Sequence, residues 1–379
     1  WTDKKVAIIG AGPAGLTTAL FLAKKGIAST VVEKAKFPRD KICGDAIPGR
    51  ALQVMESLSP ELASNFNDFS EKQIIRVGRA VAPSGAALDL HFTRHGYCAT
   101  RMSFDQFLFD EAKQRSDADF YESGDVRTIE ENASGVKLTL KDGLELETKL
   151  VIACDGAQSV VAKQMANKKV DKKHYSGAVR AYMKNVKGVP EDTMTICFLK
   201  DYLPGYFWIF PLKNNHYNVG FGMMSKDIAA RKINLKKALK EICASEEMES
   251  YFKEAAFTGD VRGYNLPMGG KKSSISGKRY MLCGDAANLI DPATGEGIGN
   301  AMLSGRLAAE QAIRCLDKDN YSADFMKQYD KAVYDKLWKE LRNKKLVQQF
   351  IGHSPALLNQ FIVAASKYDW LKSMVTKVF

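Results

Sequence analysis

A Gly-x-Gly-x-x-Gly turn between two short apolar segments constrains this chain more than any other feature. The turn is Gly10-Ala11-Gly12-Pro13-Ala14-Gly15. Residues 4–9 predict a buried strand before it, and residues 16–25 predict a helix after it that Gly26 would cap. A second predicted strand, residues 29–32, ends at Glu33. A strand, glycine turn, helix, strand and acid in this order predict a Rossmann-type α/β fold that binds a dinucleotide.

The glycines and the acid each have a physical role in such a fold. Gly10 permits the tight turn, Gly12 lets the backbone approach a pyrophosphate, and Gly15 lets the helix pack closely on the sheet. The helix N-terminus adds N–H donors and a favourable dipole. Glu33 lies 18 residues after Gly15, where a carboxylate accepts hydrogen bonds from the adenosine ribose and repels a 2′-phosphate. This pattern does not distinguish FAD from NAD.

A second glycine-rich segment lies near residue 290. Residues 278–283 predict a buried strand that ends in Gly284-Asp285-Ala286-Ala287, and the loop at 293–300 leads into a predicted helix at 298–313. Asp285 is placed to bind a ribityl hydroxyl. The N–H groups around Gly297 and Gly299 can face the pyrimidine edge of a flavin, where negative charge collects on reduction. A plain helix N-terminus with a glycine hinge is the alternative interpretation.

Four motifs in order resemble the para-hydroxybenzoate-hydroxylase-type flavoproteins. Besides the two glycine-rich segments, these are the helix start Arg101-Met102-Ser103-Phe104-Asp105 and the pair Asp155-Gly156, which follows a predicted strand at 150–154. The resemblance spans most of residues 1–320 and implies that the cofactor is FAD and that Arg101 contacts it. The cofactor-binding residues expected on this basis are Gly10, Gly12, Pro13, Ala14, Gly15, Glu33, Lys34, Arg39, Cys43, Gly44, Arg101, Asp155, Gly156, Gly284, Asp285, Pro292, Gly295, Gly297, Ile298 and Gly299.

Two further segments resemble the geranylgeranyl reductase family within that group. Lys41-Ile42-Cys43-Gly44 is similar to its Lys-x-Cys-Gly stretch, and residues 206–211 are similar to its Tyr-x-Trp-x-Phe-Pro motif. The resemblance implies reduction of C=C bonds in a prenyl or other apolar lipid-like substrate by hydride from reduced flavin. It places Cys43 at the isoalloxazine, as a catalytic proton donor or a positioning residue. A buried structural thiol is the alternative. The chain departs from the family at Asp45-Ala46, where further glycine is usual, and at the single glycine before Tyr206.

The Tyr-x-Trp-x-Phe-Pro segment also predicts a wall for an apolar substrate. Tyr206, Trp208 and Phe210 alternate along one predicted strand, so their side chains share a face. An aromatic face of this kind can line a long apolar cavity. We expect Tyr206, Trp208, Phe210 and Pro211 to bind substrate, with a plain hydrophobic core as the alternative.

These segments predict an α/β protein with interleaved domains. A discontinuous FAD-binding domain would comprise residues 1–71, 99–174 and 273–320, and a mixed β-sheet substrate domain would comprise 72–98 and 175–272. Residues 321–379 predict a C-terminal helical region, in which apolar and basic residues interleave. Such helices form either a cap with a solvated face or a surface that lies on an anionic membrane. The apolar members are Trp338, Leu341, Leu346, Phe350, Leu357, Leu358, Phe361, Ile362, Trp370 and Leu371.

Composition excludes several other classes of protein. The net charge is +11, yet no nucleic-acid-binding motif is present, so we expect no nucleic-acid partner. The seven cysteines are scattered and form no CxxC pair or Cys/His cluster, so we expect neither a bound metal nor disulfides. The chain begins at Trp1, without a basic-then-apolar signal segment or a spanning apolar run. We expect a cytoplasmic protein with peripheral membrane contact as an option. Because no second Gly-x-Gly-x-x-Gly is present, the reductant is either transiently docked NAD(P)H or a ferredoxin-like partner.

Three other functions use the same fold. An FAD-dependent monooxygenase of an apolar or aromatic substrate is the nearest alternative. A flavin-dependent halogenase requires a Trp-x-Trp-x-Ile-Pro segment, and residues 206–211 lack its first Trp and its Ile. A non-catalytic prenyl-binding protein, like the GDP-dissociation inhibitors, would not need the intact glycines, Glu33 and Asp285.

Overall fold

A parallel sheet forms the base of the molecule in this computed structural model, which describes residues 4–169, 171, 174–351, 354–368 and 370–372. Neighbouring strands are parallel except at β17, which is antiparallel to β18. Strands β1 and β2 are buried along their whole length, as expected for a sheet that is covered on both faces. The order is β17 (Ser276–Gly277), β18 (Tyr280–Leu282), β10 (Leu150–Ala153), β1 (Val6–Ile9), β2 (Thr30–Glu33) and β6 (Asp119–Glu122).

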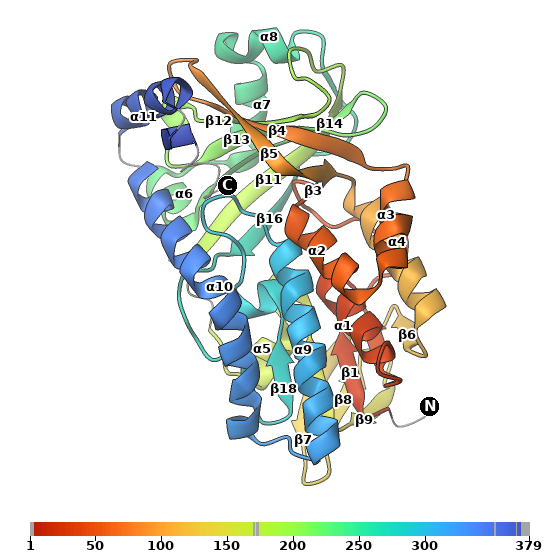
Figure 1. Cartoon of the computed structure of the whole chain (residues 1–379). Helices are drawn as coiled ribbons and strands as arrows, with labels where there is room; N and C mark the ends of the chain where they lie inside the picture. Colours follow the sequence, from red (N-terminus) through yellow and green to blue (C-terminus); the bar gives the residue numbers. More distant parts are fainter. Residues whose placement is uncertain (1–3, 170, 172–173, 352–353, 369, 373–379) are drawn as a thin grey trace.

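A larger mixed sheet of nine strands lies above the first in Figure 1. Its hairpin between β13 and β14 turns at Asn214-Asn215, both with positive φ, as a tight two-residue hairpin turn requires. The order is β15 (Ala256–Phe257), β11 (Tyr175–Lys184), β14 (His216–Met224), β13 (Tyr206–Pro211), β12 (Thr193–Cys197), β4 (Gln73–Val81), β5 (Ala87–Cys98) and β3 (Ala46–Ile47), with β16 (Arg262–Pro267) pairing with β11.

The helices surround the two sheets. α1 packs on α9 so closely that a Cβ on Gly305 would lie 2.4 Å from the carbonyl oxygen of Ala14. α10 runs along the outside of α9 from the first sheet toward the second (Figure 1). The helices are α1 (Pro13–Ala23), α2 (Gly49–Leu58), α3 (Pro60–Asp68), α4 (Arg101–Arg115), α5 (Val160–Gln164), α6 (Ser225–Arg231), α7 (Leu235–Cys243), α8 (Glu249–Phe252), α9 (Ile298–Lys318), α10 (Ala323–Ile351) and α11 (Pro355–Lys367).

The core is divided between the layers. One large cluster joins the first sheet to α1, α4, α9 and α10, and it includes side chains of a three-stranded meander, β7 (Val126–Glu131), β8 (Val136–Leu140) and β9 (Glu145–Thr148). A second cluster fills the space between β11, β13 and β14 and the helix α7. None of the described helices carries an apolar stretch long enough to cross a bilayer.

The Rossmann-type α/β fold, the mixed second sheet and the C-terminal helices are confirmed. The domain boundaries stay a prediction. Strand β3 lies inside the predicted segment 1–71 but pairs with β5 in the second sheet. Of the C-terminal apolar residues predicted above, Trp338 and Leu371 are half-buried, and the Phe350 side chain lies outside the described part. Leu341, Leu358 and Ile362 are buried, whereas Leu346, Leu357, Phe361 and Trp370 are exposed.

Candidate functional site

A cavity of about 1150 Å³ lies at the carboxyl ends of the parallel strands, between the two sheets. Its volume exceeds the roughly 300–1,000 Å³ typical of a pocket for one ligand. It therefore has room for a cofactor and a substrate together. Of the residues predicted from the sequence, only Gly15, Gly299 and Pro211 do not line it.

The glycine turn closes the cavity at the end of β1. Gly10 has φ +98°, and a Cβ there would lie 2.4 Å from the carbonyl oxygen of Cys154. A Cβ on Gly15 would lie 1.9 Å from the carbonyl oxygen of Gly10, so this glycine serves the packing of α1 on the turn. A Cβ on Gly12 would instead meet only the Arg39 guanidinium, at 3.8 Å, and no side chain caps the start of α1. The free helix N-terminus fits an anionic pyrophosphate.

Glu33 lies beside a buried cluster of arginines. Its carboxylate accepts hydrogen bonds from the backbone N–H of Ala11 at 2.8 Å and of Ala35 at 3.0 Å. Arg101 donates two hydrogen bonds to Asp105, both at 2.6 Å, and Arg39 donates a third at 2.7 Å. Burial favours the neutral form of Asp105, but the two guanidinium groups outweigh it and hold the pKa of Asp105 below its usual value. Arg101 thus lines the cavity with its guanidinium fixed in place.

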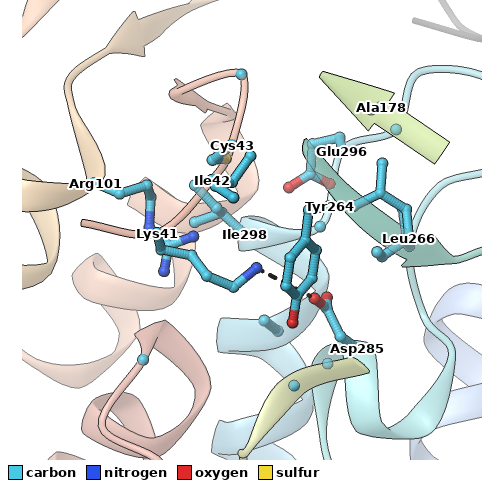
Figure 2. Close-up of a pocket in the computed structure, with 18 of the residues that line it drawn as sticks. Lys41, Ile42, Cys43, Arg101, Ala178, Tyr264, Leu266, Asp285, Glu296 and Ile298 are labelled. Atoms are coloured by element: carbon cyan, nitrogen blue, oxygen red, sulfur yellow. Dashed lines mark ion pairs between the residues drawn. The ribbon is translucent and has the colours of Figure 1, made fainter. Parts of the chain in front are cut away.

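Two aspartates follow strands of the parallel sheet. Asp155 accepts a hydrogen bond from the N–H of Val160, while its Oδ1 is buried with no hydrogen-bond partner in the described part of the chain. Burial raises the pKa of Asp155. Asp285 lies 3.9 Å from the ammonium of Lys41, which lies 3.9 Å from the centre of the Tyr264 ring (Figure 2). Both carboxyl groups are placed to bind hydroxyl groups of a ligand. Lys41 and Tyr264 were not predicted as site residues, although Lys41 stands in the Lys-x-Cys-Gly segment.

The loop between Asp291 and α9 joins the two halves of the cavity. Asp291 Oδ1 accepts hydrogen bonds from the N–H of Ala293 at 2.9 Å and of Thr294 at 3.1 Å. The Tyr206 hydroxyl, on the second sheet, donates to the Thr294 carbonyl at 2.5 Å. From α10, Lys344 donates to Asp291 Oδ2 at 2.5 Å. The loop is therefore held from both the aromatic wall and the C-terminal region.

Glu296 is a loop residue that sequence reasoning missed. Its carboxylate accepts a hydrogen bond from the N–H of Gly299 at 2.6 Å. That N–H is one of those expected at the flavin pyrimidine edge. Burial raises the pKa of Glu296 to about 7, although the Gly299 N–H opposes the shift.

Cys43 lies on a loop anchored by a buried polar network. Asn218 donates to the Cys43 carbonyl and to Asp45 Oδ2, both at 2.8 Å, and accepts from the Trp208 indole N–H at 2.9 Å. Tyr182 donates a further hydrogen bond to Asp45 at 2.8 Å. Asp45 is fully buried with φ +64°, and burial raises its pKa to about 6. Burial also raises the pKa of the Cys43 thiol. The network connects the Cys43 loop to the aromatic strand.

The aromatic strand β13 presents alternate side chains to the cavity. Tyr206, Trp208 and Phe210 line it, whereas Phe207 and Ile209 are buried in the core on the opposite face. The Trp208 ring lies over Gly220, where a Cβ would be 2.0 Å from Cζ2. Pro211 is buried outside the cavity. The wall near these residues is apolar.

These features fit an extended flavin dinucleotide. The uncapped N-terminus of α1 suits the pyrophosphate, and the acids that follow β2, β10 and β18 suit hydroxyl groups of the ligand. The Asp155 Oδ1 atom, which has no partner in the described part of the chain, can accept a hydrogen bond from the ligand. The sequence comparisons agree. A family model described as FAD binding domain matches residues 3–329.

Named relatives are reductases. The menaquinone reductase of Mycobacterium tuberculosis (strain ATCC 25618 / H37Rv) is 30% identical over 320 residues, which cover 80% of this chain and 75% of the relative. The digeranylgeranylglycerophospholipid reductase of Methanococcus vannielii is 29% identical over 348 residues, covering 89% and 84%. The crystal structure of a geranylgeranyl bacteriochlorophyll reductase-like protein from Thermoplasma acidophilum has the same fold, with a TM-score of 0.85, 24% identity and coverage of 96% and 91%. The chain therefore belongs to the FAD-dependent oxidoreductases that carry this FAD-binding domain, within the geranylgeranyl reductase family.

Proposed function

We propose that this flavoprotein reduces C=C bonds of a prenyl or other apolar lipid-like substrate. One observation carries the proposal: the glycine turn and the aromatic strand β13 line the same cavity, with the Cys43 loop between them. A cofactor at one end of this cavity would face an apolar chain at the other. The names of the two reductase relatives support a lipid substrate.

Particular residues would hold the cofactor and the substrate. The N-terminus of α1 would bind the FAD pyrophosphate, Glu33 the ribose, and Asp285 a ribityl hydroxyl. When bound, the FAD supplies hydride transfer to a carbon of the double bond. Segments 1–71, 99–174 and 273–320 would form the cofactor domain, and segments 72–98 and 175–272 the substrate domain. Tyr206, Trp208 and Phe210 would exclude water and align the chain, and Cys43 would contact the reacting end.

The test is an anaerobic reduction. The purified holoenzyme, with its flavin identified after denaturation, is reduced with dithionite and mixed with a geranylgeranyl lipid or a menaquinone. We expect flavin reoxidation and, by mass spectrometry, a gain of two hydrogen atoms for each reduced bond. A reaction that proceeds only with oxygen and yields a hydroxylated product would instead indicate a monooxygenase.

The electron donor is a separate proposal. Reduced nicotinamide would dock transiently on the open cavity, because the sequence contains no second Gly-x-Gly-x-x-Gly. Stopped-flow mixing with NADPH, NADH or a reduced ferredoxin identifies the donor by the rate of flavin bleaching. Bleaching by the ferredoxin alone would contradict the nicotinamide proposal.

We also propose that α11 rests on an anionic membrane. Its buried face, with Leu358 and Ile362, packs on Leu90 of β5, which lines the cavity. Leu357 is 64% exposed and Trp370 is 65% exposed, and the chain has a net charge of +11. Apolar side chains on a basic protein favour anionic bilayers. Sedimentation with phosphatidylglycerol vesicles should capture the protein, and Leu357→Ser with Trp370→Ser should release it. Equal capture by phosphatidylcholine vesicles would contradict this proposal.

A further inference from the structure

Among the described residues, the carboxyl group of Glu296 lies where the two halves of the cavity meet. Glu296 lies in the loop that begins α9 and is bonded to the aromatic strand through Thr294 and Tyr206. In Figure 2 its carboxylate is drawn between Ile42 and Leu266 and above the Tyr264 ring, and all of these residues line the cavity. Glu296 therefore faces the region that an apolar substrate would occupy.

Glu296 has no cation to hold it ionised. It forms no ion pair with any residue in the described part of the chain. The nearby cations are bound elsewhere: Lys344 pairs with Asp291 and Glu340, and Arg50 pairs with Glu340. A carboxyl group in apolar surroundings without such a partner favours its neutral form. The charged groups that act on it are Asp291 in its own loop, Arg50 on α2 and Lys344 on α10.

The other acids of the cavity have different positions or partners. Asp285 lies 3.9 Å from Lys41, and Asp40 forms ion pairs with Arg180 at 2.6 Å and Arg262 at 3.3 Å. Asp155 follows β10, beside the glycine turn and away from the aromatic strand. Asp45 does not line the cavity. Glu33 pairs with Arg39 at 3.7 Å, and Asp125 pairs with Arg127 at 2.9 Å. Glu296 alone, among the described acids of the cavity, therefore adjoins the aromatic wall without a cation.

We propose that Glu296 is the catalytic acid of the reduction proposed above. Its carboxyl group gives a proton to one carbon of the double bond, while hydride from the reduced flavin reaches the other. The π bond, the Glu296 O–H bond and the flavin–hydrogen bond that held the hydride break, two C–H bonds form, and the flavin supplies the two electrons and is left oxidised. Glu296 is left as a carboxylate and regains its proton from water. This inference rests on the proposed function.

Acidity distinguishes Glu296 from Cys43. A general acid works best when its pKa lies near the working pH. Burial raises the pKa of the Cys43 thiol, so the thiol is a weak acid at neutral pH, whereas the pKa of Glu296 is about 7. Cys43 then positions the substrate, and Glu296 supplies the proton.

The experiment compares the pH dependence of variants in anaerobic single turnovers. For the wild type, the rate of substrate-driven flavin reoxidation should fall as pH rises through about 7, because only protonated Glu296 donates. Glu296→Gln keeps an acceptor for the Gly299 N–H but has no acidic proton. It should react about 100-fold or more slowly, without this pH dependence. Cys43→Ala should slow the reaction yet keep the pH dependence. Glu310→Gln, on the exposed part of α9, is the matched control and should behave as wild type.

A second readout does not depend on turnover. Infrared difference spectra of the oxidised holoenzyme should contain a protonated-carboxyl band that titrates near pH 7 and is absent from Glu296→Gln. Should that variant fail to fold, Glu296→Asp must shift the band and the pH profile together. Unchanged kinetics in Glu296→Gln, or no such band in the wild type, would overturn the proposal while the proposed function stands. A wild-type enzyme that reduces no prenyl or quinone substrate would overturn the proposed function first.

Discussion

Replacing Lys344 by Met should destabilise the protein by about 3 kcal/mol. The Lys344 side chain is 9% exposed, that of Asp291 is 3% exposed, and their charged atoms are 2.5 Å apart. Removing one partner of a buried ion pair costs about 3–5 kcal/mol, because the other charge is left uncompensated. The lower figure applies here, since Asp291 keeps its hydrogen bonds from the N–H groups of Ala293 and Thr294.

The assay is equilibrium unfolding in urea at pH 7, read as a shift of the midpoint with an unchanged slope. Lys327→Met, on the same helix, is the control, because its pair with Asp324 is exposed and should contribute less than about 1 kcal/mol. The double variant Lys344→Met/Asp291→Asn should lose less stability than the sum of the single losses. Additive losses would refute the claim that this pair holds the loop between Asp291 and α9 to α10.

Three further predictions concern other parts of the site. Asp45→Asn should flatten the pH dependence of stability. In the wild type, folding favours the neutral Asp45 carboxyl, so the free energy of unfolding falls by about 3 kcal/mol as pH rises from 4 to above 6. Urea titrations of both proteins at pH 4.5 and pH 7.5 measure the difference. Gly15→Val should abolish FAD binding, measured by flavin absorbance, whereas Gly259→Ala, with open space around it, should not. Gly220→Ala should displace the Trp208 ring and raise KM for substrate, while FAD content stays at the wild-type level.

The parts of the fold that could be predicted from the sequence depend on local patterns. The glycine turn, α1 and Glu33 lie within 24 residues of one another, and each residue type there has a direct backbone or ligand role. The period of two in residues 206–210 likewise predicts which aromatic side chains share a face, and the three expected ones line the cavity.

Contacts between distant segments could not be predicted in this way. Asp45 meets Tyr182 and Asn218, which follow it by 137 and 173 residues. The neutral state that burial favours for Glu296 depends on Lys344 and Arg50 being bound by other acids, which no spacing in the sequence indicates. One signal was present: Asp45 stands where the resembling family usually has glycine, and the left-handed backbone there suits glycine or aspartate.

The way in which the chain passes between the two sheets has a mechanical consequence. It leaves the parallel sheet after β2, returns at β6, leaves again after β10 and returns at β17. Hinge motion of two lobes is absorbed by a few loop or element-terminal residues, whereas here four crossings of the chain join the two sheets. Opening of the two sheets like a clamshell would therefore have to bend every one of these crossings at once. In the proposed reaction a long hydrocarbon would then enter lengthwise, and the order in which its double bonds reach the cofactor would follow from which end of the molecule goes first.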